Sequence, residues 1–77
     1  MALIDRFEER PLTPTRLHGR VLCGYKAVNV AGERVLQLET YGSDDREFPG
    51  KVSQVIQFDE AGALELKGII ERSFPTG

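Results

Sequence analysis

The sequence predicts a small α+β domain in which extended strands precede one C-terminal helix. Apolar and polar residues alternate over residues 34–41 and again over residues 51–58, as they do in half-buried strands. Residues 60–73 instead carry apolar side chains at the three- and four-residue spacing of a helix. A chain of 77 residues has room for one small domain. We therefore expect a flexible N-terminal arm over residues 1–18 and a single domain over residues 19–77.

The arm and the first strands are predicted from residue types. Pro11 and Pro14 prevent a continuous helix and favour extended chain, although residues 2–9 can form a short helical turn before them. Residues 21–23 and 25–30 are rich in the branched and aromatic side chains of strands. Gly24 between them predicts a bulge or a sharp bend. A tight turn at residues 31–33 then leads to the next strand.

The two alternating segments predict a pair of strands joined by a long loop. Leu36, Leu38 and Thr40 share one face of the strand at residues 34–41, and Val35, Gln37, Glu39 and Tyr41 share the other. Residues 42–50 are dense in turn-forming residues, which predicts a long hairpin tip. In the following strand we expect Val52, Ile56 and Phe58 on the core side.

The predicted helix begins after Asp59, whose side chain can accept hydrogen bonds from the first-turn amides, and ends before Pro75. One arc of this helix is expected to face the sheet, namely Ala63, Leu66, Ile69, Ile70 and Phe74. A second side carries a small, large, small series that would let another backbone approach closely. We expect a dimer interface there, formed by Ala61, Leu64 and Gly68.

Composition excludes several classes of site. The single Cys23 rules out an intramolecular disulfide, and with the single His18 it leaves no His/Cys set for a closed zinc site. No nucleophile has a base within reach, so we expect no catalytic residue, no cofactor, no metal and no enzymatic activity. A chain this small also builds only a thin hydrophobic core. Since disulfides and zinc are excluded, we expect association of subunits to stabilise the fold. The absence of a long apolar run or signal-peptide pattern predicts a cytoplasmic protein.

Aromatic and cationic side chains gather toward one end of the predicted sheet. Aromatic rings stack on unpaired bases and neighbouring cations neutralise phosphates, as in sequence-tolerant single-strand sites. The residues expected to form such a surface are Tyr25, Lys26, Arg34, Tyr41, Arg46, Phe48 and Lys51. The alternative is that Tyr41 and Phe48 fold back over the core and that the charges only solvate the loop.

Three stretches of the chain resemble a known family. They are VAGERVLQLETY at residues 30–41, EFPGK at residues 47–51 and IQFDE at residues 56–60, followed by the amphipathic helix. Together they resemble the DNA-binding domain of the transcriptional coactivator called positive cofactor four and its small bacterial relatives, over about residues 20–74.

The resemblance implies a curved four-stranded antiparallel β-sheet backed by one C-terminal helix, and a homodimer formed through helix and sheet. It also implies that the paired β-surfaces hold single-stranded DNA. Tyr41 falls where this family has a stacking aromatic residue, and Lys51 falls where it has a phosphate-contacting base. The family is rich in Lys and Arg around its turn and loop, whereas this chain has Glu33, Asp44 and Asp45 there. Fewer cations predict weak binding that is lost as salt rises.

Two hypotheses follow from the sequence. The first is a homodimer that binds single-stranded nucleic acid, DNA or RNA, without base specificity, in transcription or DNA maintenance. The second is a protein-interaction or assembly module that does not bind nucleic acid. It is favoured by the charge of residues 35–77, where four basic side chains stand against eight acidic ones.

Overall fold

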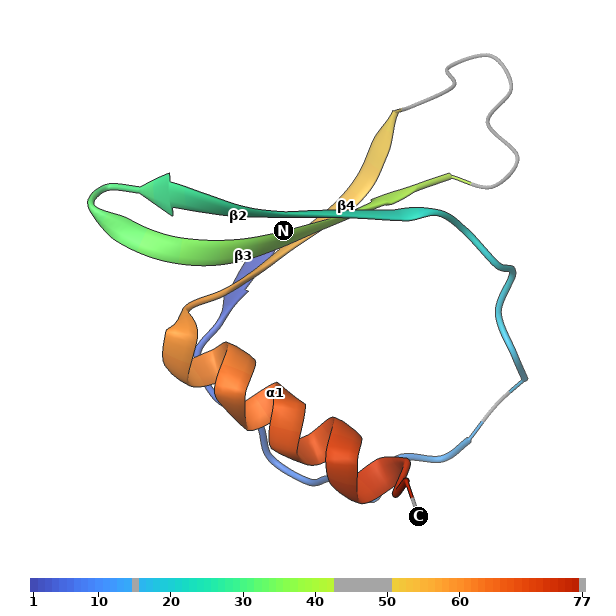
Figure 1. Ribbon diagram of the computed structural model, residues 1–77. Coiled ribbons are helices and arrows are strands. Elements are labelled where there is room, and N and C mark those ends of the chain that lie inside the picture. The colour runs from blue at the N-terminus through green and yellow to red at the C-terminus, as the bar shows by residue number, and fades with distance from the viewer. Residues whose placement is uncertain (15, 43–50, 77) are drawn as a thin grey trace.

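The computed structural model describes residues 1–14, 16–42 and 51–76, which form one four-stranded sheet and one C-terminal helix (Figure 1). The strands are β1 (Ala2–Ile4), β2 (Cys23–Val30), β3 (Glu33–Tyr41) and β4 (Val52–Phe58), and the helix is α1 (Glu60–Ser73). In the sheet they lie in the order β1-β4-β3-β2. The predicted α+β class, with strands before one helix, is confirmed.

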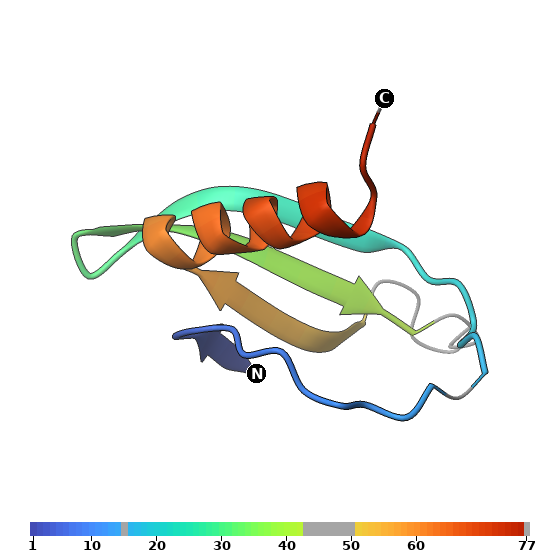
Figure 2. The ribbon, with the colours of Figure 1, turned by 90° about the horizontal axis from the view of Figure 1, so that it is seen from below.

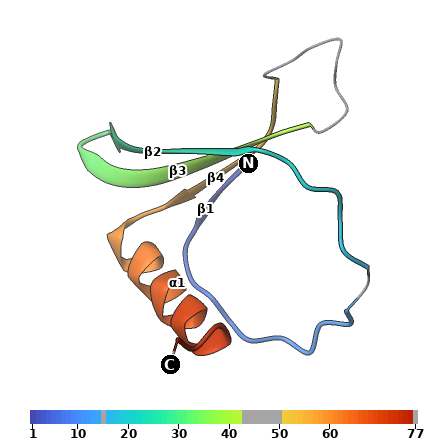
Figure 3. The same ribbon diagram turned by 45° about the vertical axis from the view of Figure 1, so that its right-hand side comes forward.

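The sheet is mixed, which corrects the expectation of a fully antiparallel one. β2 pairs antiparallel with β3, and β3 pairs antiparallel with β4, but β1 pairs parallel with β4 through Ala2, Leu3 and Ile4. The helical turn expected over residues 2–9 is likewise wrong. The outer edge of β4 has backbone N–H and C=O groups without a partner strand. The start of the chain forms β1 and pairs with these groups. Residues 5–14 lead away from one edge of the sheet, and residues 16–22 lead to the opposite edge (Figures 1 and 3).

A two-residue turn joins β2 to β3. Ala31 and Gly32 have positive φ values of 50° and 79°, as the turns that match the twist of a hairpin require. The register continues without interruption from Val30 opposite Glu33 to Cys23 opposite Thr40, so the bulge expected at Gly24 is absent. The irregularity lies instead between β3 and β4, beside Tyr41. Figures 1 and 2 show a sheet that is not strongly curled.

Helix α1 begins and ends as the sequence predicts. The Asp59 Oδ1 atom accepts a hydrogen bond from the Gly62 amide at 2.7 Å, which confirms Asp59 as the N-cap. At the other end the Phe74 amide donates to the Ile70 carbonyl at 2.9 Å. Gly62 is buried in the first turn, where the Ile4 carbonyl oxygen would lie 3.3 Å from any β-carbon added to it. A glycine here lets β1 pass close to the helix.

The helix covers only part of the sheet, because it extends away from it beyond the first turns (Figures 1 and 3). Phe58 is 5% exposed and its ring stacks on that of Phe7 from the arm, with 6.2 Å between the ring centroids. Farther along α1, Ile70 is 50% exposed and Phe74 is 74% exposed. The expectation that these two side chains face the sheet is therefore wrong. The divergence of the helix axis from the strands is the physical reason.

The structure is open for its size. Val35 and Phe58 are the large apolar side chains that are buried among the described residues. The accessible surface is 7153 Å², whereas a folded monomer of this mass exposes about 4,700 Å². The Cα radius of gyration is 14.7 Å, against about 11.5 Å for a compact domain of this length. No helix among the described residues has the length and apolarity needed to cross a membrane.

Candidate binding site on the open face of the sheet

Four polar side chains form a hydrogen-bonded row across β4 and β3, which we call the polar row. Gln57 Nε2 donates to Gln37 Oε1 at 2.9 Å, and Gln37 Nε2 donates to Glu39 Oε1 at 2.8 Å. The Tyr41 hydroxyl donates to Glu39 Oε2 at 3.3 Å. Gln57 and Gln37 are register partners, and Gln37, Glu39 and Tyr41 alternate along β3 on one face. The row therefore fixes the orientation of side chains that would otherwise move freely in water.

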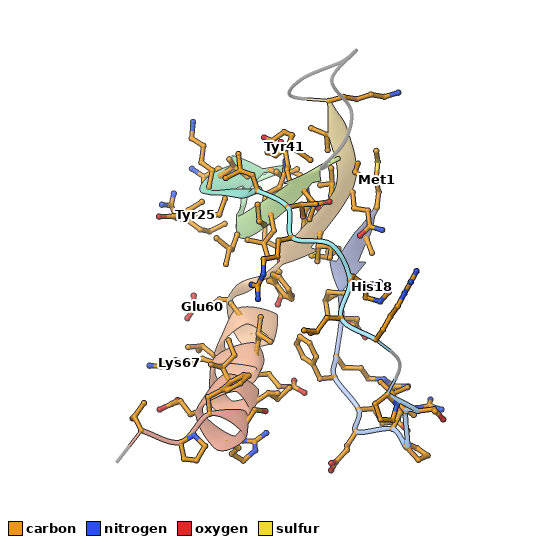
Figure 4. The ribbon with its side chains drawn as sticks, turned by 90° about the vertical axis from the view of Figure 1, so that its right-hand side faces the viewer. Met1, His18, Tyr25, Tyr41, Glu60 and Lys67 are labelled. Atoms are coloured by element: carbon orange, nitrogen blue, oxygen red, sulfur yellow. The ribbon has the colours of Figure 1, made fainter. Side chains whose placement is uncertain are left out.

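This face of the sheet is the one that α1 leaves open. Figure 4 shows Tyr41 above the sheet, on the side away from the helix. By strand alternation, the opposite face carries Leu36, Leu38, Ile56 and Phe58, which are half-buried or buried. The sequence-based alternative that Tyr41 folds back over the core therefore does not describe this arrangement. Its ring is half-buried on the open face.

A shallow hollow of about 270 Å³ lies over β2 and β3 beside the polar row. It is lined by Gly24, Tyr25, Lys26, Val28, Gln37, Glu39 and Tyr41. Lys26 is an exposed cation opposite Gln37 in the register, on the same face as Glu39 and Tyr41. The hollow thus combines tyrosine side chains, one positive charge, one negative charge and the fixed amide of Gln37.

Gly24 determines where the Tyr41 ring lies. A β-carbon on Gly24 would stand 3.2 Å from the Tyr41 hydroxyl oxygen and 3.4 Å from ring atom Cε2. The ring therefore lies across β2 directly over a residue without a side chain. The sequence predicted a special role for Gly24, but that role is close approach of a ring and not a bulge.

The surroundings of the Tyr41 hydroxyl raise its pKa. Partial desolvation, followed by the charge of Glu39 and the hydrogen bond to it, raises the pKa of Tyr41 above its ordinary value of 10.0. At neutral pH the phenol is protonated, as any tyrosine is, and it donates a hydrogen bond to Glu39; the raised pKa extends this state to more alkaline pH. The side chain can stack on a ligand without carrying a charge of its own.

The structure brings some of the predicted surface residues together and separates others. Tyr41 and Lys26 lie at the same hollow. Tyr25 also borders it, but it pairs with Leu38, so its side chain, 80% exposed, belongs to the opposite face from Tyr41. Arg34 pairs with Asn29 beside the β2–β3 turn, at the far end of β3 from Tyr41.

The remaining predicted surface residues belong to the loop between β3 and β4. Lys51 directly precedes Val52, the register partner of Tyr41, so its backbone is at the same end of the sheet as the ring. Arg46 and Phe48 lie outside the described residues, as do the acidic residues Asp44 and Asp45.

The three residues predicted for a dimer interface lie on α1. Leu64 is 59% exposed, Ala61 is exposed and Gly68 is half-buried. A β-carbon at Gly68 would meet only the Nη1 atom of Arg72, at 3.1 Å. This side of the helix is therefore accessible to a partner.

Sequence reasoning placed Gln37, Glu39 and Tyr41 on one face but assigned no role to the first two. The signal that could have identified them is the polar character of that face in both strands, since Gln57 continues it in β4. Among the described residues, no group of three or more His, Cys, Asp or Glu side chains is placed to hold a metal ion. Cys23 is exposed.

Comparison of the chain with protein-family models, curated proteins and solved structures finds no match.

Proposed function

We propose that this protein is a homodimer that binds single-stranded nucleic acid on the open face of its sheet. The observation that carries the proposal is the hollow that Tyr41 of β3 and Lys26 of β2 both line, on one face of two paired strands. A base can stack on the ring while the cation neutralises a neighbouring phosphate. The resemblance of residues 20–74 to the positive cofactor four family supports the same function and a role in transcription or DNA maintenance.

Binding of this kind is weak and sensitive to salt. Lys26 shares its face with Glu39, whose carboxylate repels phosphate, so each subunit offers little net positive charge there. The contribution of counterion release grows with the number of phosphates neutralised. Stacking is consequently a large share of the affinity, and it is tolerant of sequence because every base has an aromatic face.

The homodimer is supported by the small buried core of the described residues and by the apolar side chains that stay exposed on α1. The accessible apolar side chains on the helix side, Leu64, Ile70 and Phe74, are suited to covering by a second copy. The open face then stays available to the ligand.

Fluorescence anisotropy with a labelled thymidine oligomer of about 20 nucleotides at low salt tests the ligand. Loss of stacking predicts that Tyr41→Ala weakens binding by about 1–3 kcal/mol for each base stacked. Lys26→Ala should also reduce the slope of log affinity against log salt by about 0.7, the value for one phosphate of a single strand.

A matched control for the lysine comes from the same fold. Lys67→Ala removes a lysine from the exposed side of α1, away from the hollow. This variant should bind as the unmodified protein does. Absence of binding at low salt, or equal losses in Lys26→Ala and Lys67→Ala, would contradict the proposal. A protein that co-purifies through nuclease and high salt, with no oligomer binding, would establish the assembly module instead.

Sedimentation equilibrium tests the dimer separately. Leu64→Lys places a charge on the proposed interface and should shift the mass toward that of the monomer. Glu33→Lys, at the exposed start of β3 and outside α1, is the control for a changed charge. A monomeric mass for the unmodified protein at micromolar concentration would refute the dimer without affecting the test of the ligand.

A further inference from the structure

Glu39 places a carboxylate at the hollow, where a surface that only binds phosphates would be expected to carry a cation. Each of its two oxygens accepts one hydrogen bond, Oε1 from Gln37 and Oε2 from Tyr41. A carboxylate has about four acceptor positions. With the interactions of the described residues, one position on each oxygen stays open to a ligand. Glu39 can therefore accept two hydrogen bonds side by side.

The polar row prevents Glu39 from turning away. Gln57 holds Gln37, and Gln37 and Tyr41 hold the two carboxylate oxygens from opposite sides. A phenol is protonated at neutral pH, so the Tyr41 hydroxyl donates to Glu39 there and both restraints persist. A site whose groups are positioned before the ligand arrives loses less entropy on binding.

Among the four bases, guanine has the edge that fits two adjacent acceptors. Its ring N1–H and its 2-amino group are neighbouring donors that point the same way. Adenine and cytosine each present one amino group next to a ring nitrogen acceptor, and thymine presents one N–H between two carbonyls. Those acceptors would face a carboxylate oxygen, and unpaired polar groups of this kind strongly disfavour the wrong ligand.

We propose that the hollow selects guanine within single-stranded nucleic acid, with Glu39 accepting from N1–H and the 2-amino group. The proposal rests on the proposed function and departs from the sequence-tolerant binding that the stacking argument alone predicts. Lys26 and Tyr41, which border the same hollow, supply the phosphate contact and the aromatic surface. An arginine side chain carries a similar pair of donors, so a protein ligand is the competing occupant.

The test uses competition by unlabelled thymidine oligomers that carry isolated guanines, hypoxanthines, adenines or cytosines at the same positions. Spacing by thymines keeps the guanines from associating with one another. Hypoxanthine keeps N1–H but lacks the 2-amino group, so it isolates the second hydrogen bond. A bidentate contact predicts that the guanine oligomer binds about 5- to 150-fold more tightly than the others.

Glu39→Gln is the decisive variant. It removes the paired acceptors and one negative charge, so the guanine preference should disappear while affinity for plain thymidine oligomers is kept or rises. Glu33→Gln, an exposed glutamate at the other end of β3, should change neither. Circular dichroism confirms that each variant is folded.

The outcomes separate this proposal from the one on which it rests. Equal affinity for the guanine, hypoxanthine and thymidine oligomers would overturn guanine selection and leave single-strand binding intact. No binding of any oligomer would overturn both. Binding of an arginine-containing peptide that depends on Glu39, without binding of the guanine oligomer, would assign the hollow to a protein partner and also refute the proposal.

Discussion

Two glycines in α1 should respond in opposite ways to the same substitution. Gly62 and Gly68 both have helical conformations, and replacing such a glycine by alanine removes freedom from the unfolded chain. In an open environment this change stabilises a helix by about 0.5–1 kcal/mol. The surroundings of the two positions differ, so the structure predicts different signs.

At Gly68 the new β-carbon has an easily displaced neighbour. It would lie 3.1 Å from Nη1 of Arg72, the far end of a long and exposed side chain that can rotate away. The full gain in helix propensity should therefore be retained. We expect Gly68→Ala to raise the free energy of unfolding by about 0.5–1 kcal/mol.

At Gly62 both close neighbours are held in place. The β-carbon would stand 3.2 Å from Oδ1 of the Asp59 cap and 3.3 Å from the carbonyl oxygen of Ile4 in β1. Displacing the cap forfeits part of an interaction worth about 0.5–2 kcal/mol. Moving Ile4 disturbs the pairing of a three-residue strand. We expect Gly62→Ala to lower the free energy of unfolding by about 1 kcal/mol, because these losses exceed the gain in propensity.

Urea unfolding followed by circular dichroism measures both variants, at a concentration where sedimentation shows only the monomer for all proteins compared. Combining Gly62→Ala with Asp59→Ala should recover part of the loss, because the cap is then no longer displaced. The reasoning is refuted if Gly62→Ala is as stable as Gly68→Ala. It is also refuted if Gly62→Ala lowers the free energy of unfolding by the same amount in the unmodified protein and in the Asp59→Ala variant.

Three further perturbations follow from the contacts. The raised pKa of Tyr41 means that its proton stabilises the fold fully below pH 10.0 and that this contribution is lost as pH rises through the higher folded pKa. In alkaline absorbance titration, Glu39→Gln should therefore lower the pKa of Tyr41. Phe7→Ala removes a stacked ring and should cost about 1–2 kcal/mol in unfolding experiments, whereas Leu12→Ala, at an exposed position, should change stability by less than about 0.5 kcal/mol. Gly24→Ala displaces the Tyr41 ring, so it should weaken oligomer binding with little change in helix content. An unchanged oligomer affinity in the anisotropy assay would contradict this prediction.

The elements that sequence predicts well are those defined by local chemistry. The alternation in β3 and β4 and the side chain of Asp59 each act within a few residues, and all three are present in the structure. β1 could not be predicted in this way. It has three residues, it pairs with a strand more than fifty positions away, and its parallel register depends on how the intervening chain crosses the fold.

Which side chains meet at the candidate site depends on the register of the paired strands. The sequence determines the register of β2 and β3 only through the length of the turn between them. A two-residue turn at Ala31 and Gly32 places Tyr25 opposite Leu38, and by alternation this sends Tyr25 and Tyr41 to opposite faces. The three-residue turn that we expected would instead pair Tyr25 with Glu39, which puts both tyrosines on one face. The contact between Gln57 and Gln37 depends on the pairing of β3 with β4, whose connecting loop is long and imposes no such constraint.

We propose dimerisation on the helix side of the sheet and nucleic-acid binding on its open face. Because the two faces are opposite, each of these interactions can be disrupted without the other. The helix side has apolar side chains that water contacts, and covering them favours association. The open side has a polar row whose groups satisfy one another, so it can stay in water without a partner. Leu64→Lys should then abolish the dimer while each subunit keeps its intrinsic affinity for a short oligomer. An oligomer long enough to reach both subunits should bind the dimer more tightly than the variant, because the second contact is intramolecular.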